Sequence, residues 1–217
     1  MVKKKVVAKK KKWVKILAPK IFNNNQIGES LVTEPEVLVG RCIDVSLMVV
    51  IGDPQKQNIH VKFKITRIDN GVAHTELLAY RLMPTAAKRL MRRNKDKIDD
   101  SFVLETSDKK IVRIKPIVVL RNKTTGSVLT AMRMLVRAHL ARKISKIPAE
   151  KLFTEIIGKQ LQREAQKILR RLYPVGICEI RSLELIPVEK VKELGLSIMA
   201  PPAEKESTKE KPAVQEA

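Results

Sequence analysis

The chain has 217 residues, a formal net charge of +21 and a pI near 10.1. No segment approaches the roughly 20 uninterrupted apolar residues of a spanning helix, and no apolar stretch of about 7–15 residues follows the first lysines, so we expect neither a membrane span nor a signal peptide. A charge excess of this size favours a polyanionic partner, and without a membrane segment we expect that partner to be nucleic acid.

The first twenty residues are rich in lysine. They contain nine lysines, and the first carboxylate is Glu29. Residues 1–20 are therefore predicted to form a basic arm that contacts phosphates. Trp13 lies within this arm, and two interpretations of it stay open: it stacks on a base or ribose, or it packs against the protein's own body.

The first half of the body has the patterns of β-strands. Residues 60–65 alternate polar and apolar side chains, and the turn Asp69–Asn70–Gly71 follows, so residues 59–82 are predicted to be a hairpin. DSFVLET and IVRIKPIVVLR, joined by SDKK, predict a second pair. Pro116 has no N–H for a ladder, which puts this strand at an edge or at a bulge. The apolar run VLVGRCIDVSLMVVIG is interpreted as further strand.

The second half has the patterns of helices. From Val128 onward, apolar residues and His139 recur on one face, with Arg133 and Arg137 opposite. A second helix is predicted from Pro148 to about residue 172, and a short third one from Pro187 to Leu194, closed by Gly195. RLMPTAAKRLMRRNKDK predicts another short helix. Strands followed by helices indicate an α+β fold.

Three regions differ in composition. We expect the arm over residues 1–20, a single globular α+β domain over residues 21–199 and a disordered tail over residues 200–217, whose charges nearly cancel. Cys42 and Cys178 lie far apart without ligand-spaced neighbours, so neither a disulfide framework nor a zinc site is expected, and a reduced, cytoplasmic compartment is the simplest inference.

Positive charge is clustered along the chain. No carboxylate occurs between Asp108 and Glu150, a stretch with eleven Lys and Arg, and residues 81–97 form another basic block. One such run is most often a solvated face, but several runs together favour phosphate contacts, since each contact releases counterions. The predicted RNA-binding residues are Lys9, Lys10, Lys11, Lys12, Trp13, Lys15, Lys20, Lys88, Arg89, Arg92, Arg93, Lys95, Arg133 and Arg137. The stripe Lys159, Arg163, Lys167 and Arg170 faces either RNA or an acidic protein.

Catalytic alternatives have little support in the sequence. The three histidines have no metal or triad spacing, and His139 on an apolar face is interpreted as a core residue. IGDPQKQN lacks a phosphate-binding glycine loop and predicts a turn. The adjacent acids Asp99 and Asp100 are interpreted as a hydrogen-bonded turn in preference to a two-metal nuclease site. We expect no enzyme activity, cofactor, metal or small-molecule substrate.

An ordered set of motifs resembles one family. KKWVKILAPKIF, IGES, GRCIDVSL, GDPQKQN, FKITRI, LLAYRL, RRNKDKIDD, VRIKP and LYPVGICEIRSLEL occur in the order of the small-subunit ribosomal proteins shared by archaea and eukaryotes, the S-three-a-e or eukaryotic-type S-one family. The similarity covers roughly residues 10–190, and the compact length resembles the archaeal branch. Two positions depart from the family pattern: Asp108–Lys110, where a turn with glycine is usual, and Ala79, where glycine is frequent.

The resemblance implies a structural protein of the small ribosomal subunit. It implies an antiparallel β barrel-like core with flanking helices, and a place on the platform near the mRNA exit. The implied partners are small-subunit rRNA, neighbouring platform proteins and mRNA near its exit. The alternative from composition alone is a free-standing basic RNA-binding regulator.

Overall fold

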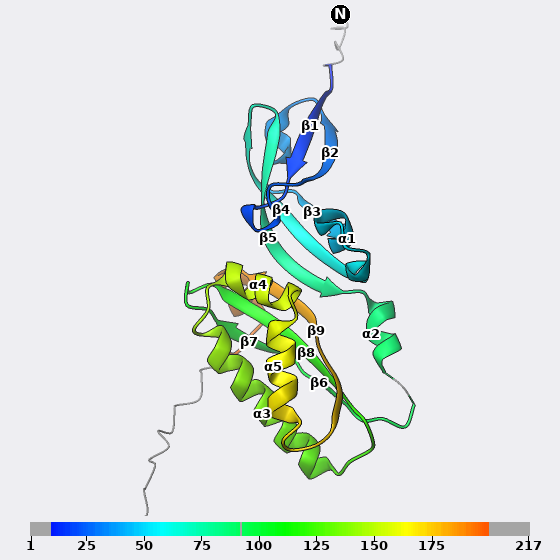
Figure 1. Ribbon diagram of the computed structural model, residues 1–217. Helices are drawn as coiled ribbons and strands as arrows, with labels where there is room; N and C mark the ends of the chain where they lie inside the picture. The colour runs from blue at the N-terminus through cyan, green and yellow to red at the C-terminus, as the bar shows by residue number, and fades with distance from the viewer. Residues whose placement is uncertain (1–9, 92, 200–217) are drawn as a thin grey trace, which may run out of the picture.

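The computed structural model describes residues 10–91 and 93–199, and Figure 1 shows an elongated molecule built around one extended sheet. The described residues form nine paired strands in the order β2-β1-β5-β9-β8-β6, with β4 on the other side of β5, β3 beside β4 and β7 beside β8. The strands are β1 Lys12–Leu17, β2 Gln26–Val32, β3 Cys42–Ser46, β4 Ile59–Asp69, β5 Val72–Leu82, β6 Lys97–Asp99, β7 Phe102–Glu105, β8 Ile111–Leu120 and β9 Val175–Ile186.

The hairpin of β4 and β5 confirms the prediction for residues 59–82. The two strands pair antiparallel from Ile59 and Leu82 to Asp69 and Val72. Asn70 (φ 48°) and Gly71 (φ 79°) both take positive φ, which a tight two-residue turn of this kind requires. The alternating residues Val61, Phe63 and Ile65 are buried, as the period of two predicts.

The second predicted strand pair is also confirmed. β7 pairs antiparallel with the first part of β8, and β6 pairs with the second part. Pro116 lies where the register of β8 against β9 shifts, so it marks a bulge in an inner strand. In the turn, Lys109 has φ 57°, a conformation that costs a side-chain-bearing residue energy and explains why glycine suits the position.

The last strand, β9, joins two portions of the sheet. It pairs antiparallel with β5 through residues 182–184 and with β8 through most of its length. In Figure 1, β1–β3 and α1 lie toward one end of the molecule, and β6–β9 with α3–α5 toward the other. The long β4–β5 hairpin reaches from the first portion to the second.

Helices cover one face of the second portion. The helices are α1 Leu47–Ile51, α2 Pro84–Leu90, α3 Gly126–Ile144, α4 Ala149–Ile157, α5 Gln160–Leu169 and α6 Val188–Glu193, with 3-10 turns at Lys20–Phe22, Pro35–Leu38 and Pro54–Lys56. Phe153 and Leu161 share the main core with Leu104 and Ile114 of the sheet. None of the described helices is long and apolar enough to cross a membrane.

Two predicted elements differ from the structure. The single helix expected over residues 148–172 is wrong: α4 ends before Gly158, and Lys159 takes φ 59°, which breaks the helix before α5 begins. The apolar run over residues 37–52, expected to be strand, is strand only in β3: residues 35–38 form a 3-10 turn, and residues 47–51 form α1, which ends at Gly52 (φ 84°). Leu47 and Val50, three positions apart, are the buried residues of α1, so packing outweighs β-propensity here.

Part of the expected arm is a strand, and the strand path of the described residues is open. Residues 12–17, placed in the arm, form β1, which pairs antiparallel with β2 and parallel with β5. The α+β class is confirmed, but the barrel-like antiparallel core is not, because the strand path of the described residues is open and includes this parallel contact. Residues 1–9 and the tail expected over residues 200–217 lie outside the described residues.

Candidate nucleic-acid interface

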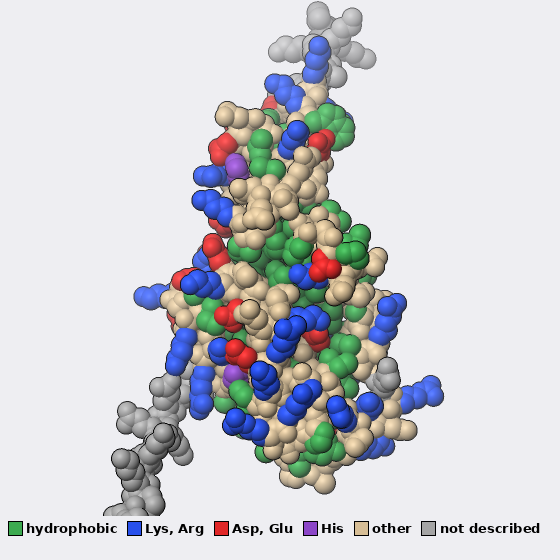
Figure 2. All heavy atoms as spheres, in the orientation of Figure 1, with side chains coloured by type: hydrophobic (Ala, Val, Ile, Leu, Met, Phe, Trp, Pro, Cys, Tyr) green, Lys and Arg blue, Asp and Glu red, His purple; other side chains and the backbone are tan. Residues whose placement is uncertain are grey.

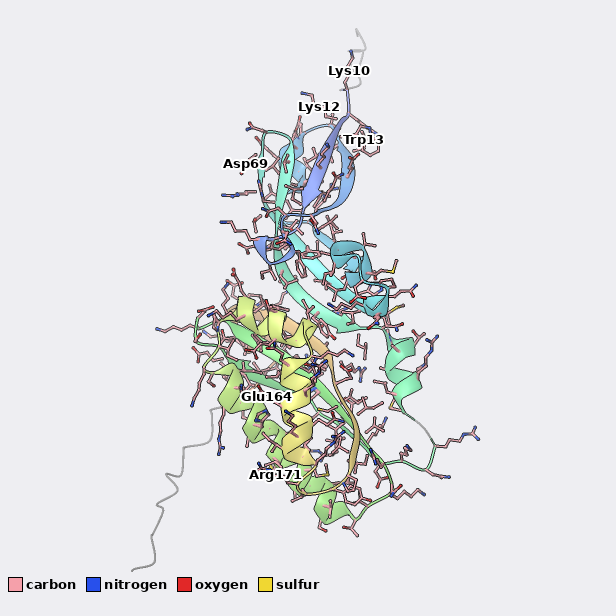
Figure 3. The ribbon with its side chains drawn as sticks, viewed as in Figure 1. Lys10, Lys12, Trp13, Asp69, Glu164 and Arg171 are labelled. Atoms are coloured by element: carbon pink, nitrogen blue, oxygen red, sulfur yellow. The ribbon has the colours of Figure 1, made fainter. Side chains whose placement is uncertain are left out.

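The N-terminal strand presents an exposed tryptophan between lysines. Val14 and Ile16 point into a small core, so Trp13 and Lys15 face outward by the alternation of a strand. Trp13 is 65% exposed and lies opposite Leu31, which is 43% exposed. Figure 3 shows Lys12 and Trp13 leaving opposite sides of β1. Packing of Trp13 against the body, one of its two interpretations, is therefore not what the structure shows.

The lysines predicted near the N-terminus are exposed wherever the structure describes them. They are Lys10, Lys11, Lys12, Lys15 and Lys20, and Lys9 lies outside the described residues.

The predicted cations after β5 lie on and beside α2. This helix begins with Pro84 and buries Ala86 and Ala87, which turns Lys88 and Arg89 toward solvent. Arg93 and Lys95, in the loop after α2, are exposed as well. Arg92 is not among the described residues.

The two predicted arginines of α3 are in different environments. Arg133 is exposed, whereas Arg137 Nη2 donates to Asp100 Oδ1 at 2.7 Å and Arg137 Nε donates to Asp100 Oδ2. Burial alone would raise the pKa of Asp100, but its hydrogen bonds from Arg137 and Ser101 and the arginine charges outweigh it, and the pKa lies below its usual value. Arg137 therefore makes a fork-shaped internal ion pair, which leaves Arg133 as the freer of the two.

The adjacent acids are both paired with arginines. Arg181 Nη1 donates to Asp99 Oδ2 at 3.0 Å, while Asp100 pairs with Arg137. Residues 10–91 and 93–199 contain no group of three His, Cys, Asp or Glu that could hold a metal ion. Burial, with a smaller contribution from Glu179, raises the pKa of Cys178 to about 12, so its thiol stays protonated near neutral pH.

His139 is a half-buried residue of α3. Burial lowers its pKa, although the charge of Glu164 acts in the opposite direction, and its Nε2 is buried without a hydrogen-bond partner in the described part of the chain. This environment suits a neutral packing residue, as interpreted from the sequence.

The structure separates the predicted cations into distinct surfaces. The lysines of β1 lie at one end of the molecule, and α3 lies in the other portion. Figure 2 shows Lys and Arg side chains gathered over the second portion, near α2, α3 and α5.

The predicted set omits Arg121, a cation of that second portion. Arg121, just after β8, lines the same hollow as Arg89 and Lys95. Arg121 reaches this hollow through the pairing of β8 with β6 and β9, and no local sequence pattern predicts that position.

Known proteins of one family match nearly the whole chain. The model of a family described as the ribosomal S3Ae family matches residues 2–188. A protein of Nanoarchaeum equitans named small ribosomal subunit protein eS1 is 30% identical over 182 residues, which covers 84% of this chain and 92% of that protein. Proteins with the same name from Methanothrix thermoacetophila (28% identical; 82% of this chain and 85% of that protein) and Halorubrum lacusprofundi (30% identical; 81% of each) are similar over the same extent.

Proposed function

The chain belongs to the ribosomal S3Ae family, and on that premise we propose that it is a structural, non-catalytic constituent of the small ribosomal subunit that binds rRNA during translation in the cytoplasm. The family match over residues 2–188 is the observation that carries this proposal. The charge excess of +21, with exposed cations on α2, α3 and β1 among others, supports RNA as the partner.

The finer placement rests on the ordered motifs. We place the protein on the platform near the mRNA exit, beside other platform proteins, with the lysines of β1 and the cations of α2 clamping rRNA phosphates. The exposed Trp13 is available to stack on a base or ribose. The ion pairs of Asp99 and Asp100 with arginines favour this role over RNA hydrolysis.

Sedimentation of the native protein tests the proposal. In a sucrose gradient of cell lysate, we expect the protein to migrate with small subunits and to stay there at moderate salt, as an integral subunit protein does. Recovery mainly in the free fractions would overturn the ribosomal role and favour the alternative, a free-standing RNA-binding regulator.

A further inference from the structure

Two hollows meet at the start of β9. The first, of about 580 Å³, is lined by Arg89, Lys95 and Arg121. The second, of about 230 Å³, is lined by Lys159 and Arg163. Gly176 and Ile177 line both hollows, so the two adjoin at the beginning of β9, and together they are called the trough.

The trough has a large excess of positive charge. Among the described residues, its lining contains five cationic side chains and one carboxylate, Glu179. Lys159 Nζ donates to Glu179 Oε1 at 2.8 Å, so this pair is neutral. The four remaining cations, Arg89, Lys95, Arg121 and Arg163, make no side-chain hydrogen bond or ion pair with any residue that the structure describes. Cations from α2, its following loop, the end of β8 and α5 thus converge without an internal partner.

The floor of the trough is held in place by contacts with backbone carbonyl oxygens. Gln166 Nε2 donates to the carbonyl oxygen of Gly176 at 2.9 Å, which ties α5 to β9. The N–H of Arg121 donates to the carbonyl oxygen of Pro174 at 3.2 Å, which ties the end of β8 to the same place. A Cβ at Gly176 would lie 3.2 Å from the carbonyl oxygen of Val119, so glycine permits this close approach of the strands. Arg121 and Arg163 are therefore carried by segments whose mutual arrangement these contacts fix.

The lining indicates which part of an RNA molecule the trough can bind. Three of the four unpaired cations are arginines, whose guanidinium groups bind phosphate with two parallel hydrogen bonds. None of the described residues that line the two hollows is aromatic, so these residues offer bases no stacking platform. Ile177, 37% exposed on the shared floor, provides an apolar contact for a ribose.

We propose that this trough, defined by Arg89, Lys95, Arg121, Arg163 and the floor Gly176–Ile177, binds the phosphate backbone of RNA without reading its sequence. The inference rests on the proposed function and deepens it, since it assigns one surface and the RNA backbone as its ligand.

The first test uses the full-length chain and a single-stranded poly(U) probe of about 20 nucleotides. Arg121→Gln with Arg163→Gln removes two charges from the trough, and Lys64→Gln with Lys151→Gln removes two from exposed positions elsewhere. At about 0.7 per phosphate contact, the first pair is expected to reduce the slope of log K against log salt by about 1.4, and the control pair by much less. Equal slopes for the trough variant and the wild type would overturn the proposal.

The second test places a photocrosslinking amino acid at Ile177 and irradiates small subunits that carry the protein. We expect a crosslink to rRNA. A crosslink only to a neighbouring protein, or no crosslink, would remove the trough from the RNA contact and leave the ribosomal role intact. If the protein does not sediment with subunits at all, the proposed function fails, and the poly(U) measurement still decides the trough.

Discussion

Arg133 and Arg137 stand about one turn apart on α3, yet only one of them has an internal partner. The side chain of Asp100 is 10% exposed, so its carboxylate depends on the guanidinium of Arg137 for neutralisation. Arg133 is exposed to solvent. Equal spacing on a helix therefore gives two arginines different roles, and only the tertiary structure distinguishes them.

Truncation of the two arginines should separate stability from binding. Arg137→Ala leaves Asp100 without its partner and is expected to lower the free energy of unfolding by about 2 kcal/mol, between the values for exposed and buried pairs. Arg133→Ala should change it by less than about 0.5 kcal/mol. Urea unfolding at neutral pH measures both, and equal losses for the two variants would contradict the assignment.

The same pair predicts a pH dependence. The folded-state pKa of Asp100 is lowered, so its stabilisation is present above the unfolded pKa near 4 and is lost as the pH falls through the folded value. The difference in unfolding free energy between wild type and Arg137→Ala should therefore shrink in acid. A difference that is constant from neutral pH down to strongly acidic pH would mean that Asp100 is not the group responsible.

At the scale of elements, α1 is a helix made from residues that favour strands. Gly52 ends it with φ 84°, and the N–H of Gly52 donates to the carbonyl oxygen of Met48 at 2.7 Å. Gly52→Ala should lower the unfolding free energy by about 1 kcal/mol, because alanine is strained at this φ. Gly28→Ala is the matched control: it lies in β2, where a new Cβ meets nothing within 4 Å, and should be neutral or slightly stabilising. Thermal unfolding of both variants checks this, and equal effects would count against a helix that ends at Gly52.

Prediction succeeded where one local pattern decides the outcome. The β4–β5 hairpin has both strict alternation and a turn with two residues suited to positive φ, so sequence and structure agree. It failed where distant packing decides: nothing local in LMVVI signals a helix, and the break at Lys159 requires a left-handed lysine that no turn rule expects.

At the scale of the whole molecule, the candidate interface could be predicted only in part. Runs of lysine and arginine are visible in the sequence, and exposure agrees for Arg89, Arg93 and Lys95. The internal partner of Arg137 and the convergence of Arg121 with α2 depend on contacts between distant segments. A sequence therefore shows how much charge is present more readily than which charges are unpaired.

The excess charge should also affect the free protein as a whole. Self-repulsion at +21 destabilises the compact state, and salt shortens its range from about 10 Å at 0.1 M to about 3 Å at 1 M. The midpoint of thermal unfolding should therefore rise between about 0.1 and 1 M KCl, by about 2–4 °C for each kcal/mol of repulsion removed. Potassium chloride is preferred to sulfate, which strengthens apolar burial by itself. A midpoint that falls with KCl would show that attractive surface pairs outweigh the repulsion.

The position of β9 delays completion of the sheet until late in synthesis of the chain. β9 is the last strand of the described chain, yet it lies between β5 and β8. While the polypeptide grows from its N-terminus, both of these strands keep an open edge until residues 175–186 have been made. Open edges invite pairing with other chains. A chain stopped before residue 175 would hold two incomplete sheets, so the continuous sheet forms only near the end of synthesis.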